Sequence, residues 1–378
     1  MIPAISCAFD SGAIEVVSSG NTGPAAELVL RIRKDTQAEF RQWFHFRVSG
    51  ARGVACTLRF ENAGACTYPK GWTDYRAAAS YDRAHWFRVP TRYDGAVLTV
   101  EHTPERDAVW YAYFEPYSLE RHQGLIGRAG DSPYARTERL GASVEGRDMD
   151  LVTLAAGNGA GKTIWIIARQ HPGETMAEWF VEGMLERLTD RADPVARRLL
   201  ERAVFHVVPN MNPDGSVLGN LRTNAAGANL NREWMAPSME TSPEVALVRE
   251  RMLETGVDAF IDVHGDEGLP YVFVAGGEML PGFTPEQAGV QSAFIANFKR
   301  ASPEFQDVHG YGAGKYNEQA LKLASKWAGH TFGCLSLTLE MPFKDNAHLP
   351  DHEVGWSGER SRKLGAAILE PLLASLEA

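Results

Sequence analysis

The 378-residue chain lacks any uninterrupted apolar run approaching the roughly 20 residues that cross a lipid bilayer. It also lacks an extended run of basic residues, and its net charge is −10. Because proteins that bind nucleic acid or anionic membranes usually present a basic patch, we expect neither kind of partner. Residues 1–10 have no basic leader and no long apolar core, so they do not resemble a secretory signal peptide. These absences together predict a cytoplasmic protein.

Cysteine is also scarce, and the four that occur form no paired metal-binding motif: Cys7, Cys56, Cys66 and Cys334. With no sign of secretion we expect reduced thiols, although the sequence does not exclude a disulfide. The composition, 44% hydrophobic and 23% charged, is that of a globular protein, and the length exceeds that of one typical domain. We therefore expect two domains.

The two regions of the chain differ in their pattern. Residues 1–120 alternate short strand-like segments, such as 42–48 and 108–114, with turn residues, which predicts an antiparallel β-sandwich domain whose aromatic residues fill its core. Residues 121–135 are polar and rich in glycine and predict a connector with a short helix. Residues 136–378 alternate strand-like and helical segments, which predicts an α/β domain with a mixed or parallel sheet.

The first candidate site lies where a predicted strand meets a predicted helix. Residues 164–168 are apolar and too short for a helix, and residues 175–188 carry apolar residues at helical spacing. His171 and Glu174 lie between them, separated by a proline and a glycine. Open α/β sheets bind ligands at the carboxyl ends of their strands, so this pair has the geometry of metal ligands. For the pair alone, a structural histidine is the simpler interpretation.

A second strand-like segment, residues 258–263, also ends in a histidine, His264. Two histidines and a carboxylate fill three positions of a tetrahedral zinc site and leave the fourth open, as in catalytic zinc sites. Asp262 points to the same side of this strand as His264. It either orients the histidine or is a polar residue satisfied at the strand end, and the sequence favours neither.

Three further charged residues are candidates for the chemistry. Residues 207–234 open with a strand and continue as a long segment dense in Asn, Gly and Pro, which favours a functional loop. Within it, Arg222 and Arg232 could donate to a carboxylate or to a developing oxyanion, or could be solvated loop arginines. Glu340 ends an apolar strand, where an unpaired charge is costly. Facing a water molecule activated by the metal, it would act as a general base.

Residues 157–163 end like a nucleotide-binding loop, but the similarity does not extend to the whole motif. Ala156 stands where the first glycine belongs, and a strand follows where a helix is required. We interpret this segment as a hairpin turn.

Six short motifs occur in a fixed order in the second region: His171-Pro-Gly-Glu174, Asn212-Pro-Asp-Gly215, Arg222, Asn231-Arg232, Val263-His264-Gly265 and Leu339-Glu340. In this order they resemble the zinc metallocarboxypeptidase superfamily, and most closely its cytosolic carboxypeptidase branch. Segments 42–48, 111–117 and 139–148 are also similar to that branch, so the resemblance covers nearly the whole chain. It implies an α/β fold in which a mixed-sheet zinc carboxypeptidase domain follows an antiparallel β-sandwich domain.

The resemblance also implies roles for seven residues: His171, Glu174 and His264 would bind one Zn²⁺, Glu340 would be the general base and later proton donor, Arg222 would polarise the scissile carbonyl, and Asn231 and Arg232 would hold the terminal carboxylate. The implied function is a cytoplasmic zinc carboxypeptidase that hydrolyses the C-terminal peptide bond of peptides or protein tails. Tails that end in glutamate are one candidate substrate. The oligomeric state is left open.

The sequence departs from the family pattern at residues that bear on the preferred substrate side chain. Asp266 and Glu267 follow the second histidine, where many relatives have a polar residue without charge. Tyr311 and Tyr316 are both candidates for a tyrosine on the substrate side. Lys326 could select an acidic terminal residue, although an exposed helical lysine is the simpler interpretation.

Two other functions remain open at this point. A zinc-dependent deacylase or amidase of small N-acyl amino acids would use the same metal ligands. A non-catalytic binding protein would use the β-sandwich and leave the α/β domain inert. The presence of Arg222, Asn231 and Arg232 together favours the carboxypeptidase.

Overall fold

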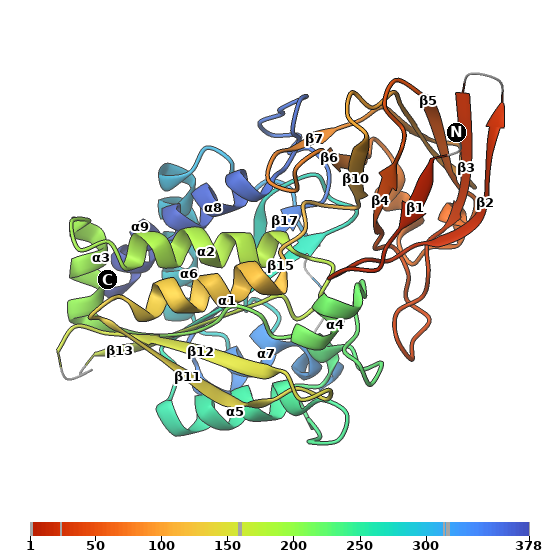
Figure 1. Cartoon of the computed structure of the whole chain (residues 1–378). Coiled ribbons are helices and arrows are strands. Elements are labelled where there is room, and N and C mark those ends of the chain that lie inside the picture. The colour runs from red at the N-terminus through yellow and green to blue at the C-terminus, as the bar shows by residue number, and fades with distance from the viewer. Residues whose placement is uncertain (1–2, 23–24, 158–160, 313, 315–317, 378) are drawn as a thin grey trace.

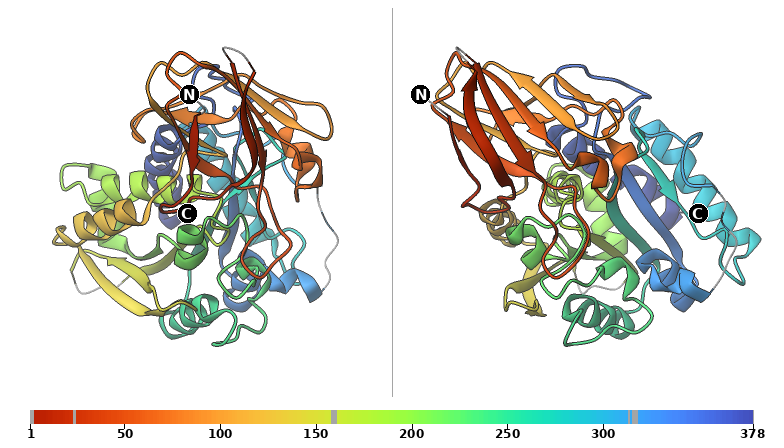
Figure 2. Two further views of the ribbon diagram at one scale, coloured as in Figure 1. Left: turned by 45° about the vertical axis from the view of Figure 1, so that its right-hand side comes forward. Right: turned by 90° about the vertical axis from the view of Figure 1, so that its right-hand side faces the viewer.

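The computed structural model describes residues 3–22, 25–157, 161–312, 314 and 318–377. Tyr316 and part of the predicted hairpin turn at 157–163 therefore lie outside the described residues. Lys162 and Thr163 begin a strand rather than the helix that a nucleotide-binding loop requires. Figures 1 and 2 show the β-rich N-terminal domain at one end of the molecule and the α/β domain at the other.

The N-terminal domain consists of two five-stranded sheets. The first has the order β1 (Ala4–Ser6), β4 (His45–Ser49), β10 (Ala108–Ala112), β6 (Ala78–Ser80) and β7 (Trp86–Arg88). The second has the order β2 (Glu15–Thr22), β3 (Ala25–Arg31), β5 (Ala55–Phe60), β9 (Leu98–His102) and β8 (Thr91–Tyr93). All neighbouring strands run antiparallel except β3 and β5, which are parallel. The predicted β-sandwich is thus confirmed.

The aromatic residues of this domain form its core, as the strand pattern predicts. Phe44, Phe46 and Phe60 are fully buried, and their ring centroids lie 4.7 to 6.2 Å apart. Strand β3 alternates buried and half-buried residues, as expected for a strand with one face on a core. Burial of these large rings provides much of the stability of a small β domain.

The second domain contains a seven-stranded mixed sheet. Its strands have the order β11 (Ala135–Ala142), β12 (Asp148–Leu154), β14 (Ala203–Val208), β13 (Lys162–Ala168), β15 (Ala259–Asp266), β17 (Leu335–Pro342) and β16 (Phe273–Ala275). The four strands β14, β13, β15 and β17 are parallel, and the three others pair antiparallel. This arrangement confirms the predicted α/β domain with a mixed sheet.

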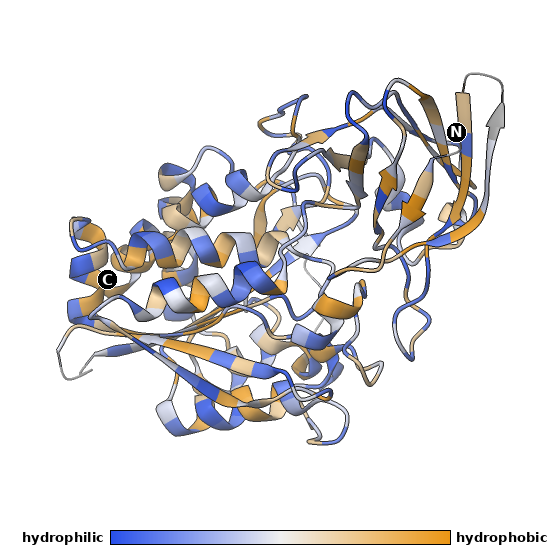
Figure 3. Cartoon of the chain, in the orientation of Figure 1, coloured by the Kyte–Doolittle hydropathy of each residue, from blue (hydrophilic) through white to orange (hydrophobic). Residues whose placement is uncertain are grey.

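Helices cover both faces of this sheet (Figure 1). One face carries α1 (Leu119–Gly130), α2 (Met176–Leu188), α3 (Pro194–Arg202), α6 (Pro285–Ala301), α8 (Gly358–Ala367) and α9 (Leu369–Glu377). The other face carries α5 (Pro243–Thr255) and α7 (Ala324–Phe332), and α4 (Pro213–Leu218) lies in the loop after β14. Figure 3 shows α1 and α5 with mixed hydrophilic and hydrophobic residues, as expected for helices with one face in solvent.

The continuous apolar run of β13 follows from burial on both sides. Ile164 and Ile166 pack with α2 in one core, whereas Trp165 and Ile167 pack with α5 and α7 in the other. A central parallel strand covered on both faces needs apolar residues at every position. This double burial places the end of β13 rigidly between its neighbours.

Helix α1 occupies most of the segment predicted as a connector, residues 121–135, and packs against β11 and β12. All four cysteines have free thiols. Over the parts of the chain that the structure describes, no helix combines the length and apolarity needed to span a membrane.

Candidate active site

Three parallel strands bring the candidate catalytic residues to one edge of the sheet. Strand β13 ends at Ala168, three residues before His171, and His264 lies near the end of β15. The register of β15 and β17 pairs His264 directly with Glu340. The carboxyl ends of parallel strands form the ligand-binding edge of an α/β sheet, so the fold itself gathers these side chains.

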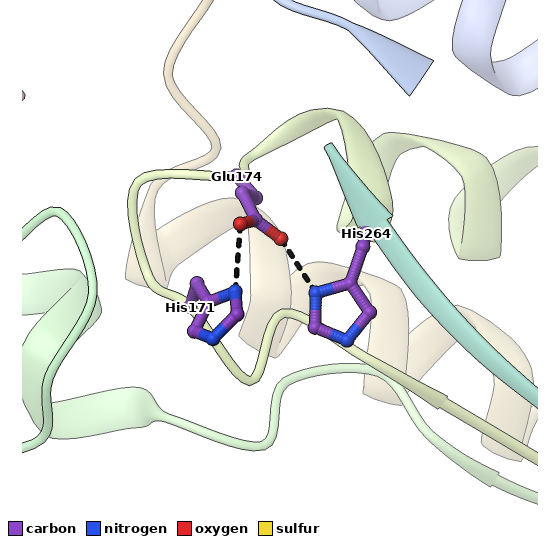
Figure 4. Close-up of side chains that lie close together, drawn as sticks. All are labelled: His171, Glu174 and His264. Carbon is purple, nitrogen blue, oxygen red and sulfur yellow. Dashed lines mark hydrogen bonds and ion pairs between the residues drawn. The ribbon is translucent and has the colours of Figure 1, made fainter. Parts of the chain in front are cut away.

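His171, Glu174 and His264 converge on a single point (Figure 4). The Nδ1 atom of His171 lies 2.7 Å from Glu174 Oε1, and the Nδ1 atom of His264 lies 2.7 Å from Glu174 Oε2. The potential ligand atoms of the three residues all lie within 4.8 Å of one another, and all three side chains are buried. The structure thus brings the three predicted metal ligands together.

The hydrogen bonds of the two imidazoles test whether this cluster suits a metal ion. The Nε2 atom of His264 lies 2.9 Å from Asp262 Oδ2, and that of His171 lies 3.1 Å from Asn229 Oδ1. With a metal ion bound at Nδ1, each neutral ring would carry its proton on Nε2, where it could donate to these acceptors. Two imidazole nitrogens and a carboxylate that converge within 4.8 Å of one another are the ligand types of a catalytic zinc site, so the donor set fits a divalent metal ion.

Burial supports the neutral state of one of these rings. Burial holds the pKa of His171 down to about 3, and the nearby positive charge of Arg222 acts in the same direction. A neutral imidazole is the form that binds a metal.

A buried chain of hydrogen bonds holds the second histidine from behind. Asp262 lies 2.9 Å from His264 and accepts two hydrogen bonds from Gln170 Nε2, at 3.0 and 2.8 Å. The indole of Trp234 donates to Gln170 Oε1 at 2.8 Å. Of the two interpretations of Asp262, the structure therefore favours the one in which it orients His264. Sequence reasoning did not identify Gln170 or Trp234, because a neutral residue beside a ligand gives no signal of its own.

A buried arginine supports the turn that carries His171 and Glu174. Arg169 has a φ of 60°, in the left-handed region that residues with a side chain rarely adopt. Its guanidinium donates to Pro172 O and Tyr117 O, both at 3.0 Å, and to Glu178 Oε2 at 2.6 Å. These three bonds compensate for the unfavourable backbone conformation and fix the turn.

Glu340 is the carboxylate that faces this cluster from β17. It is 6% exposed, and Tyr311 donates a hydrogen bond to its Oε1 at 3.0 Å. Its Oε2 has no hydrogen-bond partner among the residues that the structure describes. Burial raises the pKa of Glu340 well above its usual value. A buried carboxyl with one free oxygen and a raised pKa is suited to proton transfer.

One cavity of about 550 Å³ joins all seven residues predicted for the site: His171, Glu174, His264, Glu340, Arg222, Asn231 and Arg232. Asn231 and Arg232 lie in a short 3-10 helix, Leu230–Arg232, and Asn231 Nδ2 lies 3.2 Å from His264 Nε2. Tyr311 also lines the cavity, and the single proton of its hydroxyl is shared between Glu340 Oε1 and Asp266 Oδ2, which lies 2.7 Å from the hydroxyl oxygen. Of the two candidate tyrosines, Tyr311 is the one that lies in the described part of the chain.

Two further charged residues line the cavity. Lys326 is 8% exposed, and its Nζ donates to Gly276 O, so the interpretation of an exposed helical lysine is wrong. Burial lowers the pKa of its ammonium group. Glu267 is 6% exposed, and burial raises the pKa of its carboxyl to about 8. The cavity therefore presents both cationic and acidic groups to a ligand.

Comparison with known families assigns the two regions of the chain separately. Residues 128–360 match the model of the zinc carboxypeptidase family. Residues 5–114 match the model of the cytosolic carboxypeptidase N-terminal domain.

Solved structures agree closely over the whole chain. A metallo-carboxypeptidase from Burkholderia cenocepacia is 60% identical, with a TM-score of 0.97 and coverage of 99% of both chains. A metallo-carboxypeptidase from Pseudomonas aeruginosa, in complex with (2-guanidinoethylmercapto)succinic acid, is 45% identical, with a TM-score of 0.94 and coverage of 99% of both chains.

Among relatives found by sequence, human cytosolic carboxypeptidase 6 is 28% identical over 366 residues, which cover 86% of this chain and 70% of the human protein.

Proposed function

This chain belongs to the zinc carboxypeptidase family, and from that premise we propose that it removes the C-terminal residue of peptides or protein tails, with a preference for an acidic terminal side chain. The observation that carries the proposal is the single cavity that joins the histidine and glutamate cluster, a buried carboxyl and three cationic side chains. The names of its cytosolic relatives support a cytoplasmic location.

His171, Glu174 and His264 would hold one Zn²⁺ ion per chain. When bound, zinc acidifies a water molecule and polarises the carbonyl of the scissile bond. Glu340 Oε2, which has no partner in the described structure, accepts the proton of the attacking water. The same carboxyl then returns that proton to the nitrogen of the departing residue.

Arg222 supplies positive charge to the other side of the reacting carbonyl. Its guanidinium stabilises the negative charge that develops on the carbonyl oxygen, and loss of one such donor typically lowers kcat about 100- to 1,000-fold. Arg232 binds the terminal carboxylate as a planar donor, and the Nδ2 group of Asn231 lies beside it on the same short helix. Anchoring the carboxylate fixes which peptide bond lies at the metal, and this restricts cleavage to the last residue.

Lys326 is the basis for the acidic preference. Its ammonium group lies in the cavity and donates to a backbone carbonyl, Gly276 O, its one hydrogen-bond acceptor among the described residues, and Glu278 lies nearby. A carboxylate on the terminal side chain would replace this neutral acceptor with a charged one.

The test is a panel of peptides that differ only in the last residue, Glu, Asp, Lys or Phe, each with a free or an amidated C-terminus. We expect the highest kcat/KM for Glu or Asp and no cleavage of the amidated peptides. Replacement of Lys326 with Met should lower kcat/KM for the Glu peptide about tenfold or more and leave that for the Phe peptide largely unchanged. Efficient cleavage of amidated peptides would instead favour the deacylase or amidase.

The variant Glu340→Gln tests the assigned base on the same panel. It keeps the size of the side chain but cannot accept the proton, so we expect kcat to fall about 100- to 10,000-fold with the metal content unchanged. Full hydrolysis by this variant would overturn the mechanism.

A further inference from the structure

We propose that the N-terminal domain is part of the catalytic apparatus, because its residue Asp35 is a positioning residue for Arg222 of the other domain. This inference rests on the proposed role of Arg222 at the carbonyl oxygen. The observation behind it is a set of hydrogen bonds that cross from one domain to the other.

Asp35 binds the backbone on both sides of Arg222. Its Oδ1 accepts from Leu221 N at 2.6 Å, and its Oδ2 accepts from Arg222 N at 2.7 Å and from Thr223 N at 3.0 Å. The hydroxyl of Thr223 donates to the same Oδ2 at 3.2 Å. Asp35 is 6% exposed, so these bonds are shielded from water. A charged acceptor with four donors defines the path of three consecutive residues far more tightly than one neutral hydrogen bond does.

The loop that carries Asp35 is itself fixed to the α/β domain. Both the amide and the hydroxyl of Thr36 donate to Asn220 Oδ1 at 3.1 Å, and Gln37 Nε2 donates to Ala225 O at 3.1 Å. Gly227 has a φ of 78°, and a Cβ at this position would lie 2.4 Å from Gln37 O. The segment that carries Asp35 therefore lies close to residues 220–227 of the α/β domain. Figures 1 and 2 show this loop, which follows β3, descending from the N-terminal domain beside the chain around α4.

The N-terminal domain also holds the far end of the Arg222 side chain. Its Cζ lies 5.9 Å from the ring centroid of Phe40 and 5.4 Å from that of Tyr68. Both distances are within reach of cation–π attraction. The backbone of Tyr68 is fixed in turn by Gln42, which accepts from Tyr68 N at 3.0 Å and donates to Tyr68 O at 2.9 Å.

These contacts matter because the loop has no regular secondary structure of its own to hold Arg222 in place. Between α4, which ends at Leu218, and the short helix that begins at Leu230, the chain has no helix or strand. A donor to a developing oxyanion must be in place before the reaction, since a displacement of about 1 Å can cost on the order of 100-fold in rate. The N-terminal domain supplies that preorganisation from outside.

A double-mutant cycle in the full-length, zinc-loaded enzyme tests this role. We expect Asp35→Ala to lower kcat about 10- to 100-fold with little change in KM. In the Arg222→Ala background, the same substitution should change kcat by less than twofold, because the group that Asp35 positions is already absent. Zinc content and thermal stability are measured for every variant.

Two variants separate positioning from general stability. Asp35→Asn keeps one acceptor oxygen and should recover part of the lost kcat, and it also serves if Asp35→Ala does not fold. Gln37→Ala removes a hydrogen bond across the same domain boundary without touching residues 221–223. We expect it to lower Tm while kcat stays within twofold of the unchanged enzyme.

The inference is overturned if Asp35→Ala and Asp35→Asn lower kcat by the same factor with and without Arg222, or if they lower Tm alone. If Arg222→Ala has normal kcat, the proposed role of Arg222 fails, and the NMR signal of the Arg222 Nε–H group decides the positioning separately. That signal is identified by its loss in Arg222→Lys. Broadening or a shift in Asp35→Asn, but not in Gln37→Ala, supports positioning by Asp35, and an unchanged signal overturns it.

Discussion

The metal corner of the cavity, formed by His171, Glu174 and His264, is built within one domain, whereas the arginine corner around Arg222 is built across two. The proposed ligands of the metal corner lie near the end of β15 and in the turn after β13, and these neighbouring parallel strands are buried on both faces. The arginine corner lies on a loop whose backbone is held by Asp35 of the N-terminal domain.

The two corners would meet different requirements of the reaction, metal binding in one and stabilisation of charge on the substrate in the other. Binding a metal requires only that a few atoms converge, which the adjacent ends of β13 and β15 achieve. Stabilising charge on the substrate requires a long, flexible side chain to be held in advance, and such a side chain loses considerable rotamer freedom. We infer that damage to the metal corner should abolish both metal binding and activity, whereas damage to the arginine corner should lower activity alone.

The largest effect is expected from removing a ligand in the metal corner. His171→Ala should reduce zinc from one ion per chain to near zero and abolish peptide hydrolysis, because only two protein ligands remain. Arg222→Ala is the matched comparison and should keep one zinc ion while kcat falls about 100- to 1,000-fold. Metal analysis by mass spectrometry, together with the peptide assay, measures both quantities. Stoichiometric zinc in His171→Ala would contradict the assignment of that ligand.

A smaller effect is expected from the residues that orient the ligands. Asp262 accepts from Gln170 and lies 2.9 Å from His264 Nε2, so Asp262→Asn removes the charge that orients the ring. We expect zinc affinity to fall about 10- to 100-fold, as is typical when such a partner is lost. Competition with a chromogenic chelator measures the affinity. With saturating zinc the variant should regain most of its activity, and a permanent loss under those conditions would instead implicate Asp262 in the reaction.

The metal corner could be predicted from the sequence because its signals are local. A short apolar run that ends in a histidine, followed by a proline and a glycine, identifies both the strand and the turn. A second strand-like run leads to His264, which a glycine follows, and the burial of β13 on both faces explains why its own apolar run is uninterrupted. The resemblance to a known family then connected Arg222, Asn231 and Arg232 to the same cavity.

The arginine corner could not be predicted in the same way, because its supports are distant in sequence. Asp35 and Phe40 meet Arg222 only after two domains have docked, and nothing in their local pattern distinguishes them from other loop residues. Lys326 was misinterpreted for a related reason. Helix α7 is buried at six consecutive residues, 324–329, so it lacks the amphipathic pattern from which exposure is normally inferred.

The smallest effect concerns how firmly the arginine corner is held within its own domain, through Glu244 on α5. Asn224, two residues after Arg222 in the same loop, donates to both carboxyl oxygens of Glu244 at 3.3 and 3.1 Å. Burial raises the pKa of Glu244 to about 7. The unfolded chain loses this proton near pH 4.5, whereas the folded chain keeps it until about pH 7, so the free energy of unfolding should fall as pH rises between these values. The loss of unfolding free energy is on the order of 3 kcal/mol at most.

Glu244→Gln cannot titrate and should therefore flatten the pH dependence of the unfolding free energy, measured by urea unfolding at pH 4.5 and 7.5, while zinc content stays at one ion per chain. An equally steep slope in the variant would mean that another group is responsible.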